Sequence, residues 1–239
     1  MDQRKDFVAR ARMAREAGRT TDAIDFMRKV TSFGMLLRHE GELYAAAFKV
    51  AMKELLAACQ LIDQFSAEKP HRSVAEEYIG RLQSEIRSLC RECRAVADAH
   101  AERETLVGEE AVFWHRVSGD CSRLLAEVSV AFDRDAAASQ AELSYTAAGL
   151  AASSLSPAHP GRLAIALNFS LFQAEIMGDL ARACFIAKGA LDDAIDFVPT
   201  LAQHHKSQAG RLLHDLQACI LEWAAVLQID VAGCDWEDR

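Results

Sequence analysis

The sequence has few of the residues that make tight turns, and it has no long apolar run. Four prolines and 12 glycines occur among 239 residues, and aromatic residues make up only 7%. Sandwiches and barrels need many turns, so the composition favours long helices and an all-α fold. No window approaches the roughly 20 apolar residues that cross a membrane. Because the charged N-terminus resembles no signal peptide, we expect a cytoplasmic location.

Basic charge and disulfide patterns are lacking as well. The chain carries 27 lysines and arginines against 35 acids, a formal net charge of -8. Nonspecific binding to nucleic acid or to an anionic membrane needs a basic surface, so we expect neither partner. Seven cysteines form an odd set scattered through helical patterns, which in a reducing compartment implies no disulfide framework.

Apolar residues recur every three or four positions through most of the chain, which is the spacing of one buried helix face. One such series is Tyr78, Leu82, Ile86, Leu89, Cys93 and Val96. No stretch alternates as a strand does. Helix start and stop signals predict about nine helices. The expected breaks lie at residues 18–21, 39–41, 69–70, near 108, at 134–135, 153–160, 178–179 and 203–207.

The segment that follows Pro160 is apolar on nearly every side, so the helix that it predicts must lie between neighbours. Asn168 and Glu175 are its polar exceptions and lie on one face, seven residues apart. A buried polar side chain without a partner costs roughly 1 to 3 kcal/mol. The two residues therefore either bond to neighbouring protein groups or bind a ligand. Asp179 is expected to cap the next helix.

No residue spacing typical of catalysis or of metal binding is present. Cys90 and Cys93 form a single CxxC within a helical stripe, without a second pair at zinc-finger distance, so packing is the better interpretation. His204 and His205 point to different faces of a helix and, like His214, lack HExxH spacing, so we expect surface residues. No glycine-rich phosphate loop or nucleophile elbow occurs. The sequence predicts no enzyme, no cofactor and no metal.

Several segments resemble the 14-3-3 family. The segment HPGRLAIALNFSLFQAEI at residues 159–176 is similar to a family signature, with its proline, its arginine, the Ala-Leu-Asn-Phe-Ser core and the closing Glu-Ile. VSGDCSRLLAEV at 117–128 and AFKVA at 47–51 match further family segments, and KGALDDAIDF follows without a gap. The resemblance covers residues 2 to about 225 and is weakest over 60–104.

This resemblance implies nine antiparallel helices that form a cup, a superhelix like that of TPR repeats, in a single domain of residues 1–239. It implies a dimerisation half at 1–104, a groove half at 105–230 and a short tail at 231–239. Family members are dimeric, non-catalytic adaptors that bind phosphoserine or phosphothreonine segments of client proteins in the groove. The expected partners are phosphorylated or acidic client proteins, and a homodimer or a heterodimer with another 14-3-3 subunit.

The family's phosphate pocket is matched only in part. A phosphate carries nearly two negative charges, so its site needs converging cations. The family's lysine is Lys49 here and its fifth-helix arginine is Arg123, whereas Leu56 and Leu124 replace a second arginine and a tyrosine. At about 1.5 to 3 kcal/mol for each charged hydrogen bond, these losses weaken phosphate binding by roughly two to four orders of magnitude.

Two further cations are candidates for compensation. Lys53 lies one turn from Lys49, and Arg116 lies two turns from Arg123 at a position that is also basic in the family. The alternative for both is an ordinary solvated surface. Gln60 replaces a supporting arginine of the family.

The rest of the expected groove is mixed. By the same resemblance, the peptide-binding residues are Asn168, Glu175, Leu167, Leu171 and Trp223. On the last helix, Cys219 replaces a peptide-clamping asparagine, and Asp215 and Glu222 replace leucines. Acid on this wall repels a phosphopeptide, unless a small shift of the helix turns these two residues outward.

The resemblance also implies a dimer interface, and two functions remain open. The interface comprises Phe7, Ala11, Met13, Ala17, Arg19 and Asp22. Arg19 and Asp22 are expected to pair across protomers. The chain is either an adaptor that binds phosphorylated or acidic peptides weakly at Lys49 and Arg123, or a phosphate-independent partner that binds unmodified proteins or heterodimerises. A generic helical repeat scaffold is a third alternative, but it needs a self-similar period that we do not find.

Overall fold

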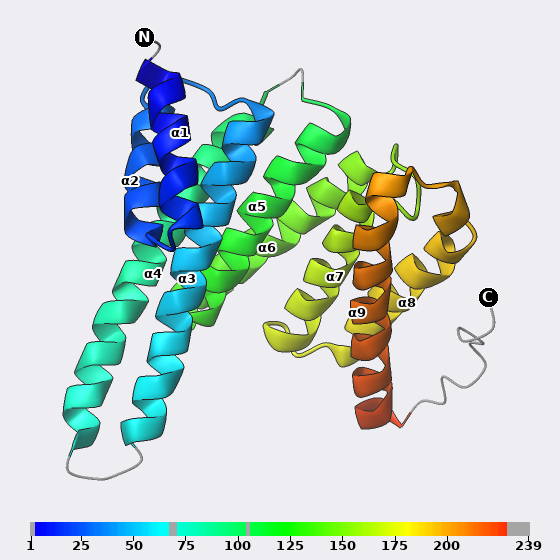
Figure 1. The fold of residues 1–239 in the computed structure, drawn as a ribbon. Coiled ribbons are helices and arrows are strands. Elements are labelled where there is room, and N and C mark those ends of the chain that lie inside the picture. Colours follow the sequence, from blue (N-terminus) through cyan, green and yellow to red (C-terminus); the bar gives the residue numbers. More distant parts are fainter. Residues whose placement is uncertain (1–2, 67–70, 104–105, 229–239) are drawn as a thin grey trace. The chain divides into compact units, whose positions relative to one another are not determined.

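The computed structural model describes residues 3–66, 71–103 and 106–228, which contain nine α-helices and no strand (Figure 1). The expected all-α fold of about nine helices is confirmed. The elements are α1 Gln3–Glu16, α2 Thr20–Thr31, α3 Arg38–Ser66, α4 Arg72–Ala101, α5 Gly108–Glu127, α6 Ala131–Ala152, α7 Pro160–Glu175, α8 Leu180–Ile195, the 3-10 turn η2 Val198–Thr200 and α9 Gln203–Leu227. None of these helices is long and apolar enough to cross a membrane.

Three of the expected helix breaks are displaced. Helix α3 already begins at Arg38, and α9 begins at Gln203, so both breaks lie earlier than the sequence pattern predicts. Residues 134–135 lie inside α6, whose start is marked instead by the extended Val130 and by the positive φ of 49° at Ala131. Charged residues on the outer face of a helix cannot be told from a loop in the sequence, because both kinds of segment are rich in polar residues.

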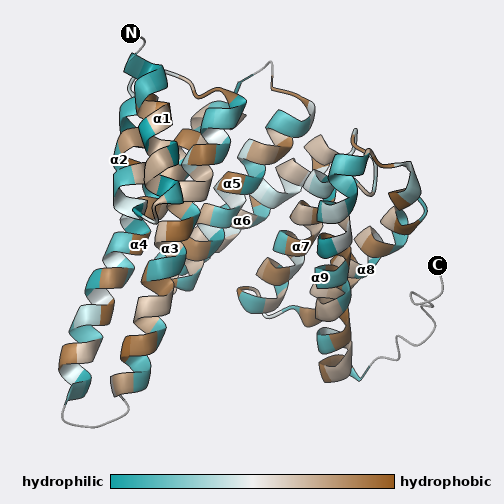
Figure 2. Ribbon diagram, viewed as in Figure 1, coloured by the Kyte–Doolittle hydropathy of each residue, from teal (hydrophilic) through white to brown (hydrophobic). Residues whose placement is uncertain are grey.

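The chain divides into two compact units, residues 1–100 and 101–239. In the first unit, α1 packs on α2, and α2 packs on α3. The largest fully buried side chains there are Tyr44, Phe48, Met27 and Ile86. Apolar and hydrophilic residues alternate around the helix axes, as the colours of Figure 2 show. Each amphipathic helix can therefore pack its apolar face into the core.

Two buried polar residues hold the turn between α2 and α3. Glu40 is almost fully buried, accepts from Arg4 Nε at 3.0 Å and accepts from the Leu37 amide at 2.9 Å. Burial alone would raise the pKa of Glu40, but these two donors lower it overall. The buried His100 accepts from the Leu36 amide through Nε2 at 3.2 Å. The turn is therefore anchored by charge and by directed hydrogen bonds, which the apolar pattern does not reveal.

The CxxC pair lies in the interior of the first unit. Cys90 and Cys93 are both fully buried on α4, and Cys90 Sγ lies 3.2 Å from Met52 Sδ. The interpretation of this pair as packing residues is confirmed.

The second unit is built from α5 to α9. Helix α5 packs along α6, while α7, α8 and α9 contact one another around a second core. A Cβ atom at Gly119 would lie 2.8 Å from the fully buried Tyr145 ring, so α5 and α6 approach too closely for any side chain at that position. The expected start signals are confirmed. Asp179 accepts from the Arg182 amide at 2.9 Å, and Pro160 occupies the first turn of α7.

Candidate functional site

In the first unit, the cations that the sequence singled out share one face of α3. Lys49 and Lys53 are both exposed and lie one helical turn apart. Leu56 is half-buried, and Gln60 is exposed one turn further on. From residue 42 to residue 60, α3 carries these two lysines and no arginine, so this part of the face lacks the fork that binds a phosphate with two parallel hydrogen bonds.

In the second unit, Asp120 on α5 collects three hydrogen bonds. Its Oδ1 accepts from the Tyr145 hydroxyl of α6 and from Asn168 Nδ2 of α7, both at 2.8 Å. Its Oδ2 accepts from Arg116 Nη1 at 3.1 Å. Burial and the neighbouring carboxylate raise the pKa of Tyr145 well above its ordinary value, so the phenol remains a donor. Arg116 and Asn168, both candidate ligand residues, are therefore oriented by a carboxylate.

Sequence reasoning did not identify Asp120 or Tyr145 as members of this site. A signal was present, because Asp120 lies four residues after Arg116 and three before Arg123 on one helix. The apolar periodicity placed Tyr145 on a helix but carried no information on what its hydroxyl meets. A buried phenol needs a hydrogen-bond partner, and that requirement is the physical reason for a carboxylate at this point.

Arg123 lies between two carboxylates. Its Nη1 is 3.4 Å from Glu175 Oε2 on α7 and 3.6 Å from Glu127 Oε2 one turn along α5. Burial works against its charge, but the Tyr145 hydroxyl and the carboxylates of Asp120, Glu175 and Glu127 raise the pKa of Arg123 overall. The side chain remains 24% exposed, so an anion from solvent reaches it. The two polar residues that the sequence singled out on α7 thus have protein partners, Asn168 in Asp120 and Glu175 in Arg123.

Leu124 follows Arg123 at the position where the family resemblance places a tyrosine. The residue is buried within the second unit. It offers no hydrogen-bond donor where the family resemblance places a phenol. The Tyr145 hydroxyl of α6 lies near enough to influence Arg123, but it donates its hydrogen bond to Asp120.

The apolar residues of the expected peptide wall are largely covered within the second unit. Leu167 and Leu171 are partly buried and pack against the core of α7, α8 and α9. Trp223 belongs to that core and is only 6% exposed. Its indole is mostly covered by its own unit and presents little surface to a bound peptide. An indole at helical core spacing has the same sequence signature in either role.

Acidic residues gather around Cys219 on α9. Burial first, and then Glu222, Asp215 and Glu175, raise the pKa of the Cys219 thiol. Asp215 and Glu222 are both exposed. The two acids of α9 and Glu175 of α7 therefore all lie close enough to Cys219 to raise the pKa of its thiol. His214 is exposed, as expected.

Three histidines lie near the N-terminal ends of α7 and α9. His159 Nδ1 accepts from the Gly161 amide at 3.1 Å, and its Nε2 faces Glu109 Oε1 at 3.2 Å. The His205 ring centroid lies 4.8 Å from that of His159 and 4.0 Å from that of His204. Burial, and then the two neighbouring imidazoles, lower the pKa of His205. The expectation of two separate surface histidines is therefore wrong for His205, which is half-buried in a ring cluster.

The residues expected at a dimer interface lie on α1, in the turn that follows it and at the start of α2. Met13 is 63% exposed and Ala17 is exposed as well. Ala11 is fully buried in its own unit, so it is removed from the expected interface. Phe7 is half-buried and stacks on Phe26, with ring centroids 6.5 Å apart.

Arg19 and Asp22 form an ion pair within the chain. This i, i+3 geometry needs no second protomer, because the two side chains are neighbours on one helix face. The pair raises the pKa of Arg19 and lowers that of Asp22.

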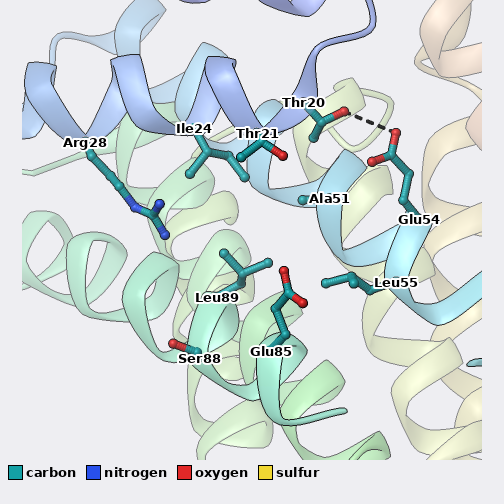
Figure 3. A pocket seen from close by; sticks show the side chains of 10 residues that line it. All are labelled: Thr20, Thr21, Ile24, Arg28, Ala51, Glu54, Leu55, Glu85, Ser88 and Leu89. Atoms are coloured by element: carbon teal, nitrogen blue, oxygen red, sulfur yellow. Dashed lines mark hydrogen bonds between the residues drawn. The ribbon is translucent and has the colours of Figure 1, made fainter. Parts of the chain in front are cut away.

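A polar groove of about 320 Å³ lies between α2, α3 and α4 (Figure 3). Its lining residues are Thr20, Thr21, Ile24, Arg28, Ala51, Glu54, Leu55, Glu85, Ser88 and Leu89. Thr20 Oγ1 donates to Glu54 Oε1 at 3.1 Å, and Arg28 donates two hydrogen bonds of 2.8 Å to Glu92. The guanidinium is engaged and the lining carries two carboxylates, so this groove is unsuited to a phosphate. The sequence pattern did not reveal it.

Comparison with known proteins gives a consistent family assignment. The family model described as 14-3-3 protein matches residues 10–224. The 14-3-3 protein epsilon of Drosophila melanogaster is 31% identical over 238 residues, which cover 96% of this chain and 91% of the relative. The 14-3-3 protein 9 of Solanum lycopersicum is 30% identical, with 95% and 90% covered. The 14-3-3-like protein GF14 psi of Arabidopsis thaliana is 30% identical, with 98% and 95% covered. This chain belongs to the 14-3-3 family.

Proposed function

We propose that this protein is a cytoplasmic, dimeric adaptor that binds phosphoserine or phosphothreonine segments of client proteins with a weakened phosphate pocket. Membership of the 14-3-3 family supports a phosphopeptide-binding adaptor role, because its members are non-enzymatic adaptors that bind phosphorylated clients and dimerise. The observation that carries the weakening is the environment of Arg123, whose guanidinium faces Glu175 and Glu127. Both carboxylates compete with a phosphate for this guanidinium.

The missing donors act in the same direction. Leu56 and Leu124 supply no hydrogen bond where the family has an arginine and a tyrosine. With roughly 1.5 to 3 kcal/mol for each charged hydrogen bond, the proposed loss is about two to four orders of magnitude in affinity. Arg116 is held by Asp120 at 3.1 Å, so Lys53, exposed one turn from Lys49, is the better candidate for compensation.

The acidic residues of α7 and α9 favour a second candidate function, phosphate-independent binding. Asp215, Glu222 and Glu175 all act on the Cys219 thiol and oppose a ligand with two negative charges. An unmodified client segment avoids this repulsion. The same features suit a structural role in which this chain forms a heterodimer with another 14-3-3 subunit that carries a complete pocket.

Dimerisation is proposed through the exposed apolar residues of the first unit. Met13 on α1, Leu61 and Phe65 on α3, and Tyr78 on α4 are each about half exposed or more. Large apolar side chains that gather on a surface mark interaction sites. Arg19 is exposed, so solvent screens its intrachain pair with Asp22, and a partner's carboxylate can replace Asp22 at little cost.

Fluorescence anisotropy of a labelled phosphoserine peptide tests this function. The phosphorylated and the unphosphorylated peptide are titrated against the wild type and against the Lys49→Glu, Arg123→Glu double variant. A matched control, Arg91→Glu with Lys188→Glu, makes the same charge change on α4 and α8. The adaptor proposal expects phosphate-dependent binding that only the first variant abolishes. Equal binding of both peptides would favour the phosphate-independent function instead.

A further inference from the structure

Helix α6 is apolar on two opposite faces. Its inner face contributes Ala137, Ala141, Tyr145 and Ala148, all buried in the second unit. Its outer face carries a second stripe, which consists of Phe132, Ala136, Ser139, Leu143, Thr146 and Leu150. We call these six residues the outer stripe. Each of them is exposed.

The spacing within the outer stripe is regular. Successive members are separated alternately by four and three residues, which is the seam pattern of a coiled coil. The stripe extends for about 27 Å at 1.5 Å per residue, or five helical turns. Its three large members, Phe132, Leu143 and Leu150, are 82%, 65% and 72% exposed. No member is charged, so the outer stripe has the character of a helix face that lacks a partner.

The rim of the outer stripe is acidic at one end. Asp133 and Asp135 flank it in the first turns of α6. Arg134 is engaged elsewhere, because its Nη2 donates to the Ile176 carbonyl at 2.6 Å. Glu142, in the middle of the rim, pairs with Arg182 of α8 at 2.9 Å. Beyond Glu142 the flanking residues are small and uncharged, so the unbalanced acid lies at the N-terminal end.

We propose that the outer stripe of α6 is a docking surface for an amphipathic helix of another protein, with lysines or arginines in its C-terminal turns. The apolar face of that helix covers Phe132, Leu143 and Leu150, and its cations face Asp133 and Asp135. Antiparallel packing follows, because cations concentrate at the C-terminal end of a helix and the two helix dipoles then attract.

Charge complementarity distinguishes this occupant from others. A second copy of α6 supplies only Arg134 as a cation, and that side chain is already engaged. An anionic membrane is repelled by Asp133 and Asp135. The stripe is also distinct from the phosphate-binding candidates, since Tyr145 reaches Asp120 from the opposite face of the same helix. The docking surface therefore operates whether or not a phosphopeptide is bound.

A designed peptide provides the probe. A labelled helix of about five turns carries leucine at every seam position of a heptad repeat, lysine beside the seam in its last two turns, and glutamine elsewhere. A scrambled lysine peptide and a peptide with glutamate in place of lysine are its comparators. The wild type is expected to bind the lysine helix at least about tenfold more tightly than either comparator.

Variants of the protein locate the binding. Leu143→Glu with Leu150→Glu is expected to weaken binding by about tenfold for each leucine, which corresponds to the burial of such a side chain. Leu221→Glu with Val226→Glu, a matched change of two exposed apolar residues on α9, leaves binding unchanged. Asp133→Lys with Asp135→Lys reverses the preference toward the glutamate peptide. Circular dichroism checks that each variant is folded. If the double glutamate variant does not fold, Leu143→Ser with Leu150→Ser replaces it as a milder change.

Three results would overturn the proposal. The wild type does not bind the lysine helix, it binds the scrambled peptide equally well, or the α9 variant loses as much affinity as the α6 variant. Sedimentation velocity is run in parallel, and a wild-type oligomer that the Leu143→Glu, Leu150→Glu variant dissociates would assign the stripe to a second copy instead. The phosphopeptide titration of the same variants is independent, so failure of one proposal does not imply failure of the other.

Discussion

Removal of the Asp120 carboxylate provides a sensitive test of how the second unit is held together. Asp120→Ala takes away the acceptor for the Tyr145 hydroxyl, for Asn168 Nδ2 and for Arg116 Nη1, which lie at 2.8, 2.8 and 3.1 Å. Tyr145 is fully buried, so its hydroxyl loses its partner where water has little access. An unsatisfied buried group of this kind costs about 1 to 3 kcal/mol.

The other two bonds add less. The hydrogen bond to the Asn168 amide contributes about 1 kcal/mol. Arg116 and Asp120 are both 24% exposed, so solvent screens their pair to about 1 kcal/mol or below. The free energy of unfolding is therefore expected to fall by about 2 to 5 kcal/mol in Asp120→Ala. Asp120→Asn retains one acceptor and the shape of the side chain, so its loss lies between the wild type and the alanine variant.

Urea unfolding, followed by tryptophan fluorescence, measures this change. Trp114 is fully buried on α5 and reports on the second unit. Asp192→Ala is the control, because it removes an exposed carboxylate that pairs with Lys188 one turn away on α8. That control is expected to change stability by less than about 1 kcal/mol. A wild-type midpoint in Asp120→Ala, or an equal loss in both variants, would refute the reasoning.

Three further predictions concern packing, pH and a buried ion pair. Gly119→Ala is expected to destabilise the second unit by about 1 to 3 kcal/mol, because the added methyl group lies 2.8 Å from the Tyr145 ring. The control Gly189→Ala meets open space and is expected to stabilise α8 by about 0.5 to 1 kcal/mol. Urea unfolding compares the two variants. Folding lowers the pKa of His205 below its unfolded value of 6.5. The contribution of this shift to the free energy of unfolding is therefore complete above pH 6.5 and is lost as pH falls through the lower pKa of the folded state. Between pH 7.5 and 5.5, His205→Gln should thus lose less stability than the wild type, and parallel loss would contradict this. Arg4→Ala leaves the buried Glu40 carboxylate without its guanidinium, and a loss of about 2 to 4 kcal/mol in thermal or urea unfolding is expected, with Arg4→Lys intermediate.

The helical architecture follows from local rules, so the sequence predicted it well. The spacing of three and four residues placed nine helices, and Asp179 and Pro160 marked two helix starts correctly. The requirement that Asn168 have a partner was also predicted, because a buried amide without one is costly. The break expected at residues 134–135 was wrong, since local polarity does not separate a loop from the solvent face of a helix.

Contacts between helices were beyond the sequence pattern. The pattern places a side chain on a helix face, but it does not fix the rotation of the neighbouring helix. The bond between Asp120 and Tyr145, the burial of Trp223 and the ring contact of His205 with His159 depend on that rotation. The outer stripe of α6 was missed for a different reason. Its alternating spacing of four and three residues is present in the sequence but was not singled out there, and the exposure of its leucines showed that nothing in the described chain covers it.

The central claim, that the phosphate pocket is weakened by missing donors, is tested most directly by restoring one. Leu56 is half-buried on α3, seven residues after Lys49, and Leu56→Arg returns a guanidinium to the face that carries the two lysines. Anisotropy of a labelled phosphoserine peptide should show an affinity gain of about ten- to a hundredfold, as one charged hydrogen bond contributes about 1.5 to 3 kcal/mol. The control Phe185→Arg adds the same charge at an exposed position on α8 and should leave the affinity unchanged. Equal affinity of the wild type and Leu56→Arg, or an equal gain in the control, would contradict the account.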